Sequence, residues 1–257
     1  LRLVGSEMCI RDRPSVAFFI CLILDLPALL AVGLMLLAAS PGGPTANLFS
    51  YIYKGDVALN ITLTAINTII SIFTLPFIIN LSLHYFMSHD SNVTFPVEKI
   101  MQVFLITLIP VIMGMLLRAK FPNLSITVSR PMRLLSIGFL TILFIFAIFR
   151  ERSNLVEYFA NIGTATAILC FSSLFIGYCI PLLMGIPEKM ARACTFEIGI
   201  HNTAIALTIA ISVLNNVTMA IPAGIYTIFM YSFATIFGVL ISRQQVVYSN
   251  KSRLSDL

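Results

Sequence analysis

The chain has 257 residues, of which 58% are hydrophobic and only 11% are charged, and its mean hydropathy is +0.97. A soluble domain carries about 25% charged residues, so this composition excludes an ordinary soluble protein and indicates an integral membrane protein. The net charge of +5 does not indicate nucleic-acid binding, because the lysines and arginines fall in short loops and tails. Apolar runs of about 20 residues predict membrane helices rather than a β-barrel.

Residues 1–13 are polar and mixed in charge, unlike the rest of the chain. They contain neither the apolar region nor the small-residue cleavage site of a signal peptide. They resemble translated sequencing-adapter sequence, so we expect a non-native leader, with native sequence resuming near Pro14. The apolar stretch Ser15–Leu24 is too short to cross about 30 Å of hydrocarbon as a helix. The sequence therefore predicts an N-terminally truncated protein that begins within a helix.

The next stretch predicts one membrane helix that is broken near its middle. Leu29–Ser40 is an apolar half-span, and Thr45–Tyr53 completes the crossing. Proline removes a backbone donor and suits the first turn of a new helix, and glycine permits unusual backbone angles. The break is expected at Pro41, Gly42, Gly43 and Pro44.

A long span, Asp56–Phe86, carries a polar stripe. Asn60, Thr64 and the pair Asn67/Thr68 recur at i, i+4 and i+7/i+8, which places them on one face of a helix. A polar face within lipid must turn toward other helices. Two interpretations remain open for this stripe: hydrogen bonding between helices, or lining of a ligand site.

The remaining apolar stretches predict the other membrane helices. They comprise three spans of little polarity, an interrupted element and a last span, namely Lys99–Leu117, Met132–Phe149, Leu155–Gly185, Pro187–Leu214 and Val217–Ile241. Residues 243–257 form a short polar tail. The five cysteines have no paired or metal-like spacing and are interpreted as small apolar helix residues.

The interrupted element holds a carboxylate, Glu197, followed closely by Gly199, His201 and Asn202. A charge at bilayer depth almost always faces a cavity or a partner, so it indicates a functional site. Gly199 and the polar residues after it predict a second helix break, which is tolerated only where protein or water surrounds it. The alternative is a loop or helix end that happens to carry Glu197, but apolar sequence flanks the motif closely on both sides.

Loop charges predict how the helices cross the membrane. If each interrupted element crosses once, one side holds ten lysines and arginines and the other side holds three. The first group is Lys54, Arg118, Lys120, Arg130, Arg133, Lys189, Arg192, Arg243, Lys251 and Arg253, and the second is Lys99, Arg150 and Arg152. Basic loops favour the cytoplasm, so the C-terminus is expected there.

The two interrupted elements have corresponding parts. Leu26-Pro27 opens the first and Ile186-Pro187 opens the second, and each has an asparagine at or after its break, Asn47 and Asn202. Two such segments in corresponding positions indicate a transporter site built from a repeat. By this symmetry the first half lacks about two and a half helices. The alternative is a coincidence of proline and glycine kinks.

Four motifs at this spacing resemble the bile acid:sodium symporter family from Pro14 to about Arg243. They are Leu26-Pro27, PGGPTAN at residues 41–47, KGDVAL at residues 54–59 and EIGIHN at residues 197–202. The resemblance implies an all-α inverted-repeat fold of ten helices, with two broken helices crossing in a core domain. Here the first two helices and part of the third would be missing. Core helices would occupy residues 14–86 and 155–242, and panel helices residues 97–150.

The resemblance also implies a set of site residues. One sodium ion would be held by Asn47, Asn60, Thr64 and Glu197. A second would be framed by Glu197, the backbone carbonyls of Ile198 and Ile200, and the side chain of His201. Helix starts near Pro44 and Asn202 would favour an anionic substrate, with contacts from Thr45, Asn202 and Thr203.

The sequence departs from the family pattern at three of these positions. Ala46 stands where the family commonly has Ser or Thr, and this loses an oxygen. Asn60 replaces another Ser or Thr but keeps an oxygen. His201 stands where Gln is usual, and an imidazole nitrogen is a poorer sodium ligand than an amide oxygen. A glutamine that the family contributes from its third helix would lie upstream of Pro14.

The expected function is therefore a sodium-coupled symporter in the plasma (inner) membrane, which takes up an organic anion such as a bile acid or small carboxylate by alternating access. Sodium is the coupling ion, and no organic cofactor is expected. One alternative is an inactive truncated fragment. Another is coupling to protons through Glu197 and His201. The sequence lacks H-E-x-x-H and G-x-S-x-G motifs, so an enzyme such as an intramembrane hydrolase is disfavoured.

Overall fold

The computed structural model describes residues 13–87, residues 155–255 and scattered positions between 113 and 142. The predicted leader, up to residue 12, and most of the predicted panel helices lie outside the described residues. The regular elements of the described part are all helical, apart from one isolated β-bridge. Among the described residues, three helices are long and apolar enough to cross a membrane: Val57–Met87, Ile162–Leu183 and Thr218–Ser242. The prediction of an all-α membrane protein is confirmed.

The first broken helix consists of α3 (Ala28–Ala39) and α4 (Pro44–Ile52), preceded by α2 (Arg13–Ile23). The chain turns sharply after α2, where Asp25 has a φ of 46°, and Pro27 then caps α3. All residues of α3 from Leu30 to Ala39 are buried, as expected for a helix that is apolar on every side. Pro44 occupies the first turn of α4, where a missing N–H is harmless.

The second broken helix repeats this local plan. It consists of α9 (Glu188–Gly199) and α10 (Thr203–Thr208), preceded by α8 (Leu155–Leu183), and a π-helical turn, Ile209–Val213, extends α10. A left-handed residue, Gly185, follows α8, and Pro187 caps α9 with nearly the same backbone angles as Pro27. Both α3 and α9 are 12 residues long. The two segments therefore follow the same sequence of turn, proline cap, helix and break.

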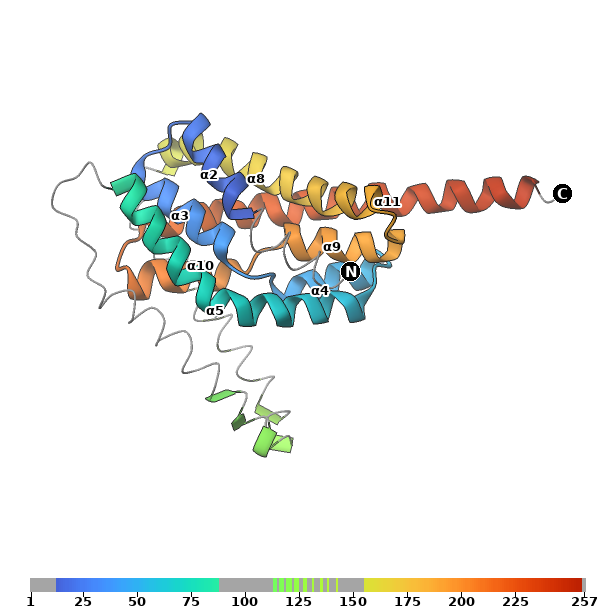
Figure 1. The fold of residues 1–257 in the computed structure, drawn as a ribbon, viewed down its shortest axis with the longest axis horizontal. Helices are drawn as coiled ribbons and strands as arrows, with labels where there is room; N and C mark the ends of the chain where they lie inside the picture. Colours follow the sequence, from blue (N-terminus) through green and yellow to red (C-terminus); the bar gives the residue numbers. More distant parts are fainter. Residues whose placement is uncertain are drawn as a thin grey trace.

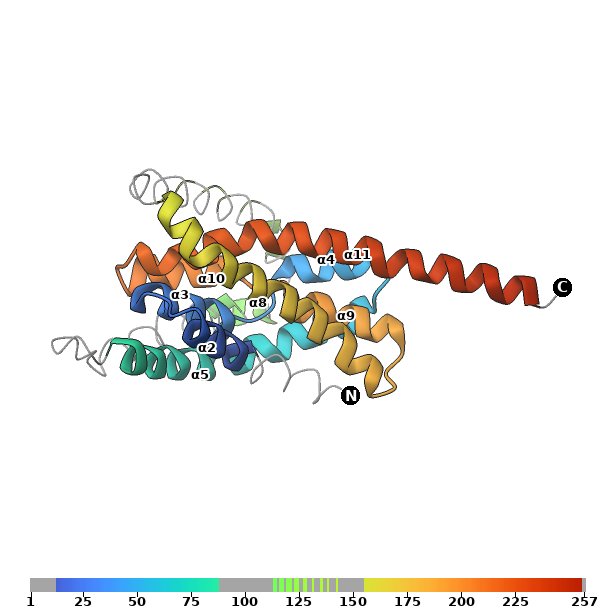
Figure 2. The same ribbon diagram turned by 90° about the horizontal axis from the view of Figure 1, so that it is seen from above.

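The breaks lie side by side in the middle of the bundle. In Figures 1 and 2, α3 and α10 occupy one half of the bundle, and α4 and α9 occupy the other. The β-bridge between Gly42 and His201 joins the two breaks. The long helix α5 (Val57–Met87) runs along one side of this crossing. The helices α8 and α11 (Ile221–Ser255) run along the other side (Figure 1), and α11 continues through most of the predicted polar tail.

The polar stripe of α5 faces the interior of the bundle. Asn60 and Asn67 are buried, whereas Phe73 and Phe77 on the other side of the helix are exposed. This arrangement is inverted relative to a soluble protein, because the surface of a membrane helix meets lipid. Close packing brings α9 against α8, where a Cβ on Gly177 would lie 3.0 Å from the Cα of Thr195, a tighter approach than most Cβ contacts. The buried face of α5 and the polar end of α9 thus meet at the crossing.

Candidate ion site at the helix crossing

Glu197 is the charged residue at the centre of the crossing. It lies near the end of α9 and is fully buried. Thr64 Oγ1 donates a hydrogen bond to Oε2 at 2.5 Å, and Asn67 Nδ2 donates one to Oε1 at 3.0 Å. Gly42 lies on another side of the carboxylate, and a Cβ at this glycine would overlap the carboxyl group. The carboxylate is therefore held between α5 and the break that follows α3.

The two helix breaks satisfy each other's backbone groups. Gly43 N donates to the carbonyl of Ile200 at 2.9 Å, and Asn202 N donates to the carbonyl of Pro41 at 2.8 Å. Unwound backbone within a membrane needs such partners, because lipid offers none. The side chain of Asn202 also accepts a hydrogen bond from Ile205 N at 3.3 Å and so caps α10. The structure places the breaks at residues 40–43 and 200–202, next to the predicted Gly199.

Asn60 links three helices beside Glu197. Its Nδ2 donates to Ser50 Oγ in α4 at 2.7 Å and to the carbonyl of Ala193 in α9 at 2.9 Å. Its Oδ1 lies 3.5 Å from Thr64 Oγ1. Because both amide hydrogens are used for packing, the oxygen of Asn60 is the atom left for a ligand.

Asn47 contributes an oxygen whose hydrogen-bonding capacity is unused. Its Oδ1 is buried and has no hydrogen-bond partner among the described residues. Such an atom normally costs about 1–3 kcal/mol, so it needs an explanation. Within the described ranges, no group of three His, Cys, Asp or Glu side chains could hold a metal ion. Amide, hydroxyl and carboxylate oxygens instead suit a hard cation, and the residues present fit sodium.

His201 is held by a neighbouring tyrosine. Its Nδ1 lies 2.8 Å from Tyr226 Oη, and this hydroxyl donates to the carbonyl of Gly199 at 2.9 Å. Tyr226 has a single hydroxyl proton, so Nδ1 of His201 carries its own proton and donates it to the tyrosine. Nε2 is then the bare nitrogen, and it is buried without a hydrogen-bond partner in the described part of the chain.

The other predicted site residues lie around the same crossing. Ile198 and Ile200 are buried, and the carbonyl of Ile200 already accepts the hydrogen bond from Gly43. Thr45, Asn202 and Thr203 are half-buried at the starts of α4 and α10. Ala46, which replaces a hydroxyl residue of the family pattern, is fully buried. The structure thus brings Asn60, Thr64 and Glu197 together and places the other predicted residues on the helices and breaks that meet there. Part of the second set is occupied by contacts within the protein.

Sequence reasoning missed the role of two buried polar residues. Asn67 belongs to the predicted stripe, but its contact with Glu197 was not expected. Arg192, counted above among the loop cations, lies in α9 and is fully buried. Its guanidinium binds Glu188 at 2.5 Å, the carbonyl of Tyr53 at 3.0 Å and the carbonyl of Ile241 at 2.8 Å. Arg192 therefore links α9 to the C-terminal end of α4 and to the apolar part of α11.

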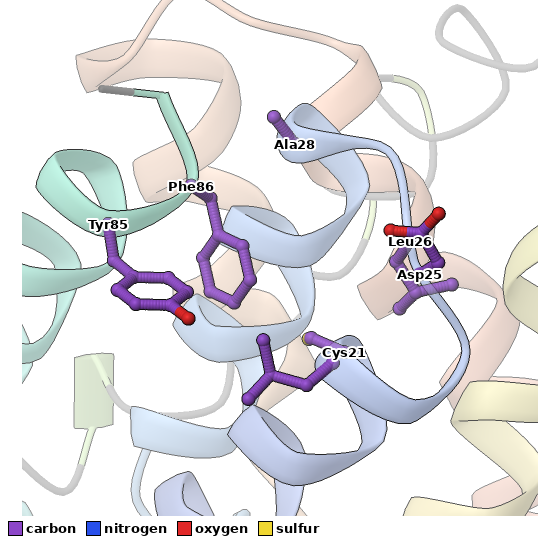
Figure 3. Close-up of a pocket in the computed structure, with 7 residues that line it drawn as sticks. Cys21, Asp25, Leu26, Ala28, Tyr85 and Phe86 are labelled. Carbon is purple, nitrogen blue, oxygen red and sulfur yellow. The ribbon is translucent and has the colours of Figure 1, made fainter. Parts of the chain in front are cut away.

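A separate pocket lies where the turn between α2 and α3 meets the end of α5 (Figure 3). It contains none of the predicted site residues. The pocket is lined by Cys21, Leu22, Asp25, Leu26, Ala28, Tyr85 and Phe86.

The sequence matches a known family. The model of the Sodium Bile acid symporter family matches residues 10–159. A probable sodium/metabolite cotransporter of Arabidopsis thaliana chloroplasts, BASS1, is 27% identical over 84% of this chain and 52% of the relative. The human ileal sodium/bile acid cotransporter is 24% identical over 95% of this chain and 70% of the relative. An uncharacterized sodium-dependent transporter of Bacillus subtilis strain 168, YocS, is 22% identical over 84% of this chain and 65% of the relative. The chain spans about half the length of the plant cotransporters that it matches.

Proposed function

Because this chain belongs to the Sodium Bile acid symporter family, whose members are transporters and not enzymes, we propose that it is a sodium-coupled symporter of an organic anion. The observation that carries the proposal is the fully buried carboxylate of Glu197, which hydroxyl and amide groups surround at the crossing of two broken helices. Burying a carboxylate in an apolar interior is strongly unfavourable unless hydrogen bonds and a positive charge compensate it. A bound cation removes much of that penalty.

The proposed first sodium ligands are oxygens of Asn47, Asn60, Thr64 and Glu197. They come from α4, α5 and α9, so a sodium ion held there would link both broken helices to the long helix α5. The second proposed set has fewer atoms available to bind sodium. It consists of Glu197, the carbonyls of Ile198 and Ile200, and the side chain of His201. Its histidine bonds to Tyr226 and one of its carbonyls bonds to Gly43. We therefore expect the first set to dominate sodium binding.

The proposed substrate is a bile acid or a small carboxylate that docks beside the ion. Thr45, Asn202 and Thr203 offer polar side chains that are only half-buried near the breaks. The N-terminus of α4 lies near this region, and the positive end of its helix dipole favours a negative charge. A neighbouring sodium ion adds to that attraction, so each ligand raises the affinity for the other. This mutual effect is the physical basis of coupling.

The proposed transport cycle is alternating access by movement of the core domain against the panel domain. The matching plan of α3/α4 and α9/α10 supports the interpretation as an inverted repeat, with core helices at residues 14–86 and 155–242 and panel helices at 97–150. Reporter fusions at the C-terminus would test the proposed topology, with the protein in the plasma (inner) membrane and its C-terminus in the cytoplasm. A reporter that is active only in the cytoplasm is expected to be active when it is fused to the C-terminus of this chain.

Uptake into proteoliposomes tests the proposed function. The protein is reconstituted, and entry of a labelled bile acid and a labelled small carboxylate is compared under an inward sodium gradient and an equal potassium gradient. Uptake that needs sodium and disappears in Glu197→Gln is expected. Asp25→Asn is the matched control, because it removes an exposed carboxylate at the turn after α2 and should leave uptake unchanged.

Two other outcomes would replace this proposal. Uptake driven by a pH gradient without sodium would favour coupling to protons, for which the buried pair Glu197 and His201 is the candidate. Absence of uptake under both gradients, with correctly folded protein, would favour a chain that is inactive as it stands.

A further inference from the structure

We propose that Asn67 is an additional oxygen ligand of the cation site at the crossing, through its side-chain carbonyl oxygen Oδ1. The proposal rests on the proposed function of this site, because it assumes that a cation is bound beside Glu197. It goes beyond that function by adding a residue that neither the family motifs nor the polar stripe distinguishes from its neighbours.

The contact between Asn67 and Glu197 fixes the orientation of the amide. Asn67 lies in α5 with only 1% of its surface exposed, and its Nδ2 donates to Glu197 Oε1 at 3.0 Å. A carboxylate accepts hydrogen bonds and repels a carbonyl oxygen, so the NH₂ group has to face it. The Oδ1 atom is the other polar atom of the same planar amide group, and it is not bonded to Glu197.

The Oδ1 atom of Asn67 has no hydrogen-bond partner among the described residues, although it is buried. An orphaned amide oxygen destabilises the protein unless something pairs with it. Asn47 Oδ1 is buried and orphaned in the same way, and it is one of the proposed sodium ligands. Holding Glu197 requires a donor only, so the bond to the carboxylate alone does not explain the unused acceptor. If Asn67 is a cation ligand, its NH₂ group holds Glu197 while its oxygen binds the cation, and both polar groups of the amide have a partner.

The register of α5 supports the same assignment. Asn60, Thr64 and Asn67 follow one another at i, i+4 and i+7, so they form one row along the helix. Thr64 and Asn67 bind the two different oxygens of the Glu197 carboxylate. Asn67 therefore continues the row of polar side chains beyond Thr64 and, like Thr64, contacts the Glu197 carboxylate.

The test is a sodium titration of the thermal stability of the purified full chain at constant ionic strength, with potassium as the balancing salt. Asn67→Ala removes both the oxygen and the donor. Asn67→Asp keeps an oxygen, replaces the donor with a second oxygen and adds a negative charge beside Glu197, which also favours a bound cation. Asn80→Ala is the matched control, because Asn80 is an exposed asparagine of the same helix. The quantity compared is the sodium concentration that gives half of the maximal stabilisation.

Asn67→Ala is expected to raise this concentration by about tenfold or more, which corresponds to the loss of one good ligand. For Asn67→Asp, this concentration is expected to stay within about threefold of that of the unchanged protein, or to be lower. For Asn80→Ala, it is expected to equal that of the unchanged protein. If Asn67→Ala stays within about twofold, the proposal is wrong. If Asn67→Asp is as weak as Asn67→Ala, Asn67 only positions Glu197 and the ligand role is wrong. If sodium fails to stabilise even the unchanged protein, the proposed function fails and this inference fails with it.

Discussion

The carboxylate of Glu197 lies directly against the backbone of Gly42, at the point where the two helix breaks meet. A Cβ at position 42 would occupy the space of the carboxyl group. Glycine is therefore required here by close approach, whereas the left-handed backbone that often demands glycine is absent at this residue. This relationship joins the first broken helix to the charge carried by the second.

Gly42→Ala is expected to displace the Glu197 carboxylate and to weaken its bonds to Thr64 and Asn67. The apparent affinity for sodium should fall by at least about tenfold, which corresponds to a loss of about 1.4 kcal/mol of binding free energy. A sodium titration of thermal stability measures this effect. Gly163→Ala is the control, because a Cβ at this α8 position meets only ordinary van der Waals contacts, 3.5 Å from the ring of Phe159. Equal sodium responses in the two variants would contradict the claim that Gly42 leaves the space that the Glu197 carboxylate needs.

Arg192→Met is expected to lower the free energy of unfolding by about 3 kcal/mol, because it leaves the carbonyls of Tyr53 and Ile241 without their charged donor. Denaturation of the purified protein in detergent measures the change. Lys189→Met is the matched control, because Lys189 is an exposed cation of the same helix. Arg192→Lys should recover part of the loss only, since an ammonium group cannot reach all three partners as a planar guanidinium does. A loss as small as that of Lys189→Met would show that the buried contacts contribute little.

Tyr226→Phe is expected to lower the free energy of unfolding by about 1–2 kcal/mol, because the carbonyl of Gly199 and the Nδ1 proton of His201 lose their partner. A double-mutant cycle with His201→Gln measures how strongly the two side chains act together. The predicted coupling energy is about 1 kcal/mol. Strictly additive losses would show that His201 is held by its surroundings and not by Tyr226.

The broken helices could be predicted from the sequence because their signals are local. Apolar half-spans of limited length, separated by Pro41–Gly43, give α3 and α4 within a residue of the expected bounds. The polar face of α5 was also predictable, because its period and the exclusion of polar groups from lipid leave one orientation. Glu197 stood out because it is a charge followed closely by a long apolar stretch, which places it within a predicted membrane element.

The contacts within the site could not be predicted in this way. Asn67 and Thr68 are both compatible with the stripe, and only the rotation of α5 against α9 decides that Asn67 meets Glu197 while Thr68 bonds to its own helix. Arg192 follows a turn by only a few residues, so its charge suggested a loop. It is buried because α4 and α11 cover the first turns of α9, which is a property of the tertiary packing alone.

The most direct test of the central claim is the thermal stability of the purified protein across sodium at constant ionic strength, measured in the unchanged protein and in Glu197→Gln. The account predicts that sodium raises the melting temperature more than potassium does, and that this difference disappears when the carboxylate becomes an amide. Equal curves in sodium and potassium for the unchanged protein would contradict the proposed ion site. So would a sodium effect that survives in Glu197→Gln.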